Sequence, residues 1–226
     1  MFKSFSILLL LMLLVSCGKE NSNVDLNTYE SYFPMVFGTY VDYEVVDIKH
    51  DINAEIMSDT SVYYLRTVIG DTITDNANRL ARKFFRKKRN ELSEPWVITD
   101  VWTTLINDNR VEVTEENKRK VWLILPPLNS SSWDRNAYNT DDAILCTYDG
   151  IHENLPVHNI EFDSVLTVEQ EEVLNLVSFR RKYEQYANKI GLVNKHYKDL
   201  NIFNFDTLNI QSGSELFYKC IGFGVE

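Results

Sequence analysis

Two histidines, His152 and His158, have a residue type and a spacing that could support metal chemistry. They flank the stretch "ENLPV", whose first residue, Glu153, adjoins His152. Imidazole and carboxylate groups are zinc ligands, so this loop could in principle hold a metal ion. A zinc hydrolase would instead show H-E-x-x-H, and a structural zinc site would add paired cysteines. Neither pattern accompanies the two histidines, so the sequence predicts loop histidines and no metal site.

Other reaction chemistries also lack their sequence patterns. No G-x-S-x-G is present, and Ser130–Ser132 lies in a loop without a patterned base. The oxygen-rich positions 107–109 and 141–142 do not have EF-hand spacing, and no glycine-rich loop could hold a phosphate. We therefore predict no catalytic residue and no cofactor. The alternative is a membrane-anchored hydrolase of envelope glycans or peptides, with a site assembled from distant residues.

One segment, "RLARKFFRKKR" at 79–89, carries seven basic residues in an otherwise acidic chain. The structural interpretation is that this segment forms the solvated face of a strand or of a short amphipathic helix. The functional interpretation is that it contacts lipid head groups or an acidic partner. Each basic residue near an anionic surface contributes about 1 kcal/mol to binding. The candidate contact residues are Arg82, Lys83, Arg86, Lys87, Lys88 and Arg89.

Aromatic residues offer a second candidate site. Tyr43, Trp96, Trp102 and Trp122 lie in strand-like segments and could line a concave apolar cavity. Aromatic residues in strands more often belong to the core, so this expectation competes with a purely structural one.

Composition limits the class of protein. The 226 residues include 23 Lys+Arg and 33 Asp+Glu, giving a formal charge of −10, which argues against nucleic-acid binding. Hydrophobic residues make up 44% of the chain, enough for a core, and no repeat of 20–50 residues is visible. Cys146 and Cys220 both sit in apolar runs, where a disulfide and two buried thiols are alternatives.

Aromatic and β-branched runs separated by polar turns dominate from residue 29 onward. "GTYVDYEVVDI" alternates, with Val41, Tyr43 and Val45 on one face, and Asn107-Asp108-Asn109 has the composition of a hairpin turn. The stretch 167–191 is ambiguous, because a capping box and helical spacing compete with its content of Tyr, Phe, Val and Ile. We predict strand for most of it. The expected fold is mainly β: one antiparallel curved sheet forming a half-barrel, barrel or sandwich, after an N-terminal signal helix.

The N-terminus shows where the protein is expected to reside. The apolar run Ile7–Val15 would span about 14 Å as a helix, too short for a hydrocarbon core of about 30 Å. Leu14-Val15-Ser16-Cys17 resembles the lipobox of bacterial lipoproteins. That resemblance implies cleavage between Ser16 and Cys17, lipidation of Cys17, a signal peptide over 1–16, a tether over 17–28 and one β-rich domain over 29–226. Because Gly18 follows the cysteine, the outer membrane is the expected location.

Two further phrases, "YFPMVFGTYVDYEV" and "YEQYANKIGLVNKHYKDL", are similar to uncharacterised Gram-negative lipoproteins. Those proteins have a Y-F-P…G motif near the mature N-terminus and a Y-A-x-x-[IV]-G-L-V hairpin near the C-terminus. Tyr40 departs from the family, which usually has tryptophan there. By analogy the resemblance implies a curved sheet of the carrier or lipocalin-like kind, with no known catalytic residue. The expected function is that of a non-enzymatic envelope lipoprotein that binds a hydrophobic ligand or an envelope protein.

Overall fold

The computed structural model describes residues 31–226, and all of its regular elements are β-strands. The expectations for Ser16, Cys17, the signal helix and the tether lie outside the described residues. The described part contains no helix that could cross a membrane. The strands are β1 (Thr39–Asp51), β2 (Ser58–Thr74), β3 (Leu80–Arg89), β4 (Val97–Asn107), β5 (Arg110–Glu115), β6 (Lys118–Ile124), β7 (Ser132–Asp134), β8 (Leu145–Tyr148), β9 (Glu153–Val157), β10 (Ile160–Leu174), β11 (Ser178–Ala187), β12 (Gly191–Phe203) and β13 (Asp206–Val225).

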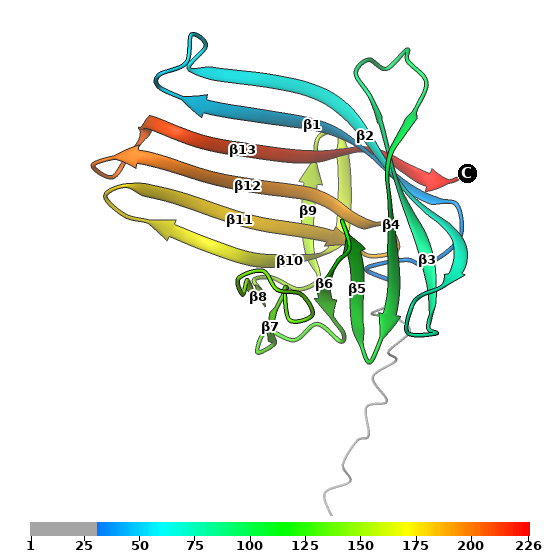
Figure 1. Cartoon of the computed structure of the whole chain (residues 1–226). Helices are drawn as coiled ribbons and strands as arrows, with labels where there is room; N and C mark the ends of the chain where they lie inside the picture. Colours follow the sequence, from blue (N-terminus) through cyan, green and yellow to red (C-terminus); the bar gives the residue numbers. More distant parts are fainter. Residues whose placement is uncertain (1–30) are drawn as a thin grey trace, which may run out of the picture.

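These strands form a single antiparallel sheet that curls until it is nearly closed into a barrel (Figure 1). Its order is β6-β5-β4-β3-β2-β1-β13-β12-β11-β10-β8-β7, with β9 paired to β10. The two ends of this order meet through Val121 N, which donates to Arg135 O at 2.8 Å, and Trp133 Nε1, which donates to Val121 O at 3.1 Å. The expected curved antiparallel sheet is therefore confirmed.

The ambiguous stretch 167–191 is mostly strand, as predicted. Asn175 Oδ1 accepts hydrogen bonds from the backbone N–H groups of Val177 and Ser178, which closes a tight turn between β10 and β11. A helix through this stretch would leave no such turn, and β11 instead pairs with both β10 and β12. The turn at Asp108 and Asn109 also forms, with φ angles of 48° and 61° that these residue types tolerate.

The two cysteines do not form a disulfide. Cys146 on β8 and Cys220 on β13 are both free and both fully buried. The disulfide considered from sequence is therefore excluded, because each thiol packs as a small apolar group in its own part of the core.

The two phrases that carry the family resemblance lie side by side in the fold. The segment before β1 enters one end of the barrel, where Tyr32 and Phe33 are buried. Lys189 N donates to Ser31 O at 2.7 Å, and a Cβ on Gly191 would be 3.7 Å from the Pro34 ring. Gly191 has a φ of 103°, a conformation that glycine permits. Both phrases therefore build the same end of the barrel.

At the opposite end, long hairpins extend beyond the barrel (Figure 1). Adjacent hairpin ends are joined by hydrogen bonds from Ile52 N to Gln211 O and from Ile202 N to Val177 O. Their turns and flanking positions carry exposed apolar side chains: Ile52, Ile56, Met57, Leu174, Leu176, Val177, Phe203, Phe205 and Leu208.

Candidate functional site: an aromatic chamber with two cations

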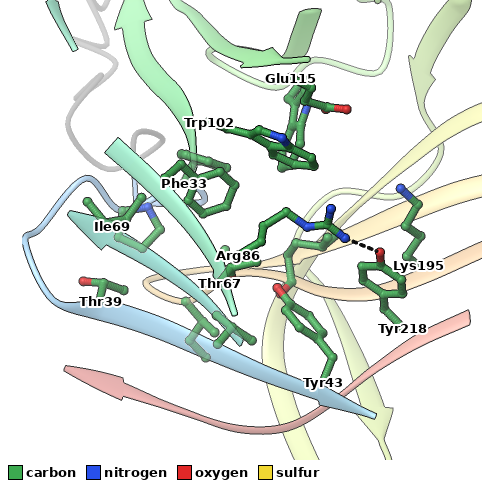
Figure 2. A pocket seen from close by; sticks show the side chains of 17 residues that line it. Phe33, Thr39, Tyr43, Thr67, Ile69, Arg86, Trp102, Glu115, Lys195 and Tyr218 are labelled. Carbon is green, nitrogen blue, oxygen red and sulfur yellow. Dashed lines mark hydrogen bonds between the residues drawn. The ribbon is translucent and has the colours of Figure 1, made fainter. Parts of the chain in front are cut away.

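A cavity of about 70 Å³ lies inside the barrel, and we call it the chamber (Figure 2). Its lining comes from strands far apart in the sequence: Phe33, Pro34, Thr39, Val41, Tyr43, Thr67, Ile69, Phe84, Arg86, Trp102, Glu115, Trp122, Ile190, Gly191, Leu192, Lys195 and Tyr218. A water needs about 10–15 Å³ measured in the same way, so the chamber has room for roughly five such spheres. It therefore fits a small group and not a long acyl chain.

Aromatic rings form the apolar wall of the chamber. Phe33 packs edge-on against Phe84 and Trp122, with ring centroids 5.9 and 5.8 Å apart. Phe84 also lies 6.2 Å from the Trp102 ring. Such tilted and T-shaped pairs add about 0.5–1.5 kcal/mol each beyond the area they bury. The wall is therefore a firmly packed surface to which β3, β4, β6 and the segment before β1 all contribute.

Polar groups gather on the other side of the chamber, as Figure 2 shows. Arg86 donates through Nη1 to Asp100 at 2.9 Å and through Nη2 to the Tyr218 hydroxyl at 3.1 Å, while its guanidinium carbon lies 4.5 Å from the Trp102 ring centroid. Lys195 Nζ lies 5.4 Å from the Tyr218 ring centroid. Strand register explains the neighbourhood, because Lys195 is directly opposite Tyr218 in the β12–β13 pair.

A polar cleft of about 280 Å³ adjoins the chamber and shares Glu115 and Lys195 with it. Glu115 accepts hydrogen bonds from Trp122 Nε1 and from Lys120 Nζ, each at 2.9 Å. The cleft is lined by Glu115, Lys120, Arg135, Asn136, Asp141, Ile144, Gln170, Glu171, Lys182, Lys195 and Tyr197. The chamber, which is mainly apolar, and the cleft, which is mainly charged, are therefore neighbours with Glu115 and Lys195 between them.

The carboxylates of the cleft are engaged in ion pairs. Besides the Glu115–Lys120 pair, Glu171 Oε2 lies 3.0 Å from Lys182 Nζ, and Asp141 Oδ1 lies 2.6 Å from Lys118 Nζ. A two-carboxylate hydrolase needs two carboxyl groups that face each other across the scissile bond. The carboxylates that line the cleft instead each lie against a lysine ammonium group, so the cleft gives no support to the hydrolase alternative.

A serine and a histidine do meet at the barrel end that holds Tyr32. His152 Nδ1 lies 2.9 Å from Ser164 Oγ, and the Tyr32 hydroxyl lies 2.6 Å from the same oxygen. Neither Ser164 nor His152 lines the chamber or the cleft. A nucleophile needs a space beside it for the reacting carbonyl, so this cluster carries no argument for hydrolysis. Within residues 31–226, no group of three or more His, Cys, Asp or Glu side chains is arranged to hold a metal ion.

Three of the four predicted cavity aromatics line the chamber: Tyr43, Trp102 and Trp122. Trp96 does not. It precedes β4, and its ring lies 5.0 Å from the Arg66 guanidinium carbon and 4.1 Å from that of Arg89. This position has a simple cause, since Trp96 lies outside the regular strands whose alternation directs side chains inward.

The basic segment is strand β3, in the interior of the sheet order, and not a helix. Alternate residues of a strand face opposite sides, so the six candidate residues are divided between two faces. Arg86 lines the chamber, whereas Lys87 Nζ lies 2.8 Å from Glu226 Oε1. Lys88 Nζ lies 3.9 Å from the Tyr63 ring centroid, and Arg82 donates to Gly70 O. Arg89 contacts Trp96, and Lys83 lies 4.0 Å from Asp71. The segment therefore does not present one continuous basic patch.

Comparison with known proteins does not assign the chain to a family. No protein-family model matches the chain, and no curated protein matches it significantly.

Proposed function

We propose that the protein is a lipid-anchored, non-enzymatic binding protein of the cell envelope, tethered through Cys17, whose chamber takes a small hydrophobic ligand. The observation that supports this most is the chamber itself, a concave space whose apolar wall is formed by Phe33, Phe84, Trp102 and Trp122. Concave, mostly apolar sites with a few convergent polar groups are the usual form of small-molecule sites. The volume of about 70 Å³ favours a ligand with a small apolar part over a whole lipid.

Ligand binding is tested with the mature protein purified from its membrane in a mild detergent. Trp102 and Trp122 line the chamber, so an occupant changes their fluorescence. Mass spectrometry of the purified protein under native conditions identifies what co-purifies. We expect a bound small molecule, or saturable fluorescence changes with small apolar compounds. An empty protein whose fluorescence responds to none of these compounds would refute the binding function.

The anchor is tested separately. Radiolabelled palmitate should appear on the wild-type protein and be absent from Cys17→Ser, which should also retain the leader peptide. Cys146→Ser serves as the matched control, because Cys146 is fully buried and lies on β8. Labelling of Cys17→Ser at the wild-type level would remove the anchor from the proposal while leaving the ligand site untouched.

The hairpin ends favour a second candidate function, binding to another envelope protein. Nine exposed large apolar side chains gather where the β1–β2, β10–β11 and β12–β13 hairpins end side by side. Clustered exposed apolar residues are typical of interaction sites, whereas scattered ones are ordinary. Crosslinking in intact cells from a photoreactive residue at Phe205 should yield one discrete adduct, and the same group at exposed Lys219 should not. Equal or absent crosslinking at both positions would exclude this function.

A further inference from the structure

One buried glutamate faces two cations at the boundary between chamber and cleft. Glu184 Oε2 lies 2.8 Å from Arg135 Nη1, and Glu184 Oε1 lies 3.3 Å from Lys195 Nζ. The hydroxyls of Tyr186 and Tyr197 donate to the same carboxylate at 2.7 and 2.8 Å. One negative charge therefore faces two positive charges, and its oxygens are already well supplied with donors.

Lys195 keeps its charge in this environment. Burial by itself lowers its pKa, but Tyr197 and Glu184 outweigh that effect and raise the pKa above the ordinary value of 10.5. The ammonium can donate three hydrogen bonds, and its side chain is 18% exposed, toward the space shared by chamber and cleft. Lys195 thus brings a positive charge that Glu184, already paired with Arg135, does not neutralise.

The Tyr218 hydroxyl has a hydrogen left to donate. It accepts a hydrogen bond from Arg86 Nη2 at 3.1 Å, and a guanidinium is only a donor. Among residues 31–226 the structure shows no acceptor for the hydrogen of Tyr218 itself. Figure 2 shows Arg86, Tyr218 and Lys195 close together along the same side of the chamber. This side of the chamber is therefore rich in donors and positive charge and short of acceptors.

We propose that the chamber binds a small monocarboxylate whose anionic group is held by Lys195, Tyr218 and Arg86 and whose apolar tail lies against Phe33 and Trp122. This inference rests on the proposed ligand-binding function and names its ligand class. A carboxylate supplies two acceptor oxygens and one negative charge, which are what this side of the chamber lacks. The aromatic wall then receives the apolar tail, and a larger polar extension would lie in the cleft.

The test compares butanoate with butanamide, which have nearly the same shape, are small enough for the chamber and differ in charge. Binding to the mature protein is measured by tryptophan fluorescence and by calorimetry. We expect the carboxylate to bind at least about tenfold more tightly than the amide, because hydrogen bonds to a charged group are the stronger ones. Lys195→Met should reduce that preference to about twofold or less. Lys219→Gln removes an exposed charge from the neighbouring strand β13 and should leave the preference unchanged.

The outcomes separate this inference from the function on which it rests. Equal binding of acid and amide to the wild type overturns the carboxylate assignment and leaves the hydrophobic chamber intact. Binding of neither compound overturns both. An undiminished preference in Lys195→Met overturns the role of Lys195. If that variant does not fold, Tyr218→Phe removes only one hydroxyl, and it should weaken binding of the acid more than of the amide.

Discussion

Arg135 and Glu184 form an ion pair buried inside the barrel, with side chains only 5% and 1% exposed. Arg135 follows β7, the last strand of the sheet order, and reaches over β8 and β10 to a carboxylate on β11. Burial opposes ionisation of Glu184, but the charges of Arg135 and Lys195 outweigh it and hold the pKa of this carboxyl far below its ordinary value. The pair therefore links the closing edge of the barrel, after β7, to β11.

Glu184→Gln should lower the free energy of unfolding by about 3–5 kcal/mol, because it leaves Arg135 buried without its counter-charge. Urea denaturation followed by circular dichroism measures the loss. Arg180→Gln is the matched control. Arg180 also forms ion pairs, with Glu171 and Asp199, but the Arg180 side chain is 43% exposed. It should cost about 1 kcal/mol or less. Equal losses for the two variants would contradict the importance of the buried pair.

The Glu184 carboxyl group should also make the stability of the fold depend on pH. Because the folded-state pKa of Glu184 lies below its ordinary value of 4.5, its contribution is complete above that pH and decreases as the pH falls below it. We expect the wild type to lose more stability than Glu184→Gln between about pH 6 and pH 3. Parallel stability curves for the two proteins over this range would show that Glu184 is not responsible.

Cys146 and Cys220 should be unreactive in the folded protein. Burial raises the pKa of each thiol to about 12, so the reactive thiolate is scarce at neutral pH. A colorimetric thiol assay should detect neither cysteine before denaturant is added and both afterwards. Reaction in the native state would mean that at least one of these thiols is accessible. A third thiol after denaturation would indicate that Cys17 is not acylated.

Phe33→Ala should destabilise the protein and enlarge the chamber. The ring is buried between Phe84 and Trp122, and truncations of buried phenylalanine cost about 3–5 kcal/mol. Water entering the enlarged space should shift the emission of Trp122 to longer wavelength. Phe37→Ala, at an exposed ring in the same segment, is the control and should change neither property. An unaltered denaturation midpoint in Phe33→Ala would disprove the packing role.

Gly213→Ala should be far more harmful than Gly222→Ala on the same strand. Gly213 has a φ of 129°, and a Cβ there would lie 2.2 Å from Asp199 O. A Cβ on Gly222 would meet only the Asp42 Cβ, at 4.0 Å. We expect a loss of more than about 2 kcal/mol for the first substitution and less than about 1 kcal/mol for the second. Thermal denaturation of both variants ranks them directly.

The β architecture was predictable because it rests on short-range signals. Alternation in β1 and the turn residues Asp108 and Asn109 act within a few positions, and both are visible in the sequence. The stretch that became β10 and β11 was harder, because helical spacing and strand composition disagreed there. Pairing with β12 decided it, and that partner lies outside any local window.

The chamber was only partly predictable. Tyr43, Trp102 and Trp122 were recognised by residue type, but Lys195 and Tyr218 were not, since charged and hydroxyl side chains are expected on the surface. A signal existed for Lys195, which shares a strand face with Val193 and Tyr197, one fully buried and one partly buried. Arg86 was assigned to a surface patch because neighbouring charges in sequence were treated as neighbours in space, although they alternate between faces.

The position of β1 has a consequence for biogenesis. This strand, the first one among the described residues, pairs along its whole length with β13, so Thr39 lies opposite Val225. Pairing at such a sequence separation is slow and leaves strand edges unpaired in the meantime. A nascent chain therefore cannot complete this sheet before residue 225 has been synthesised, and one edge of β1 stays unpaired until then.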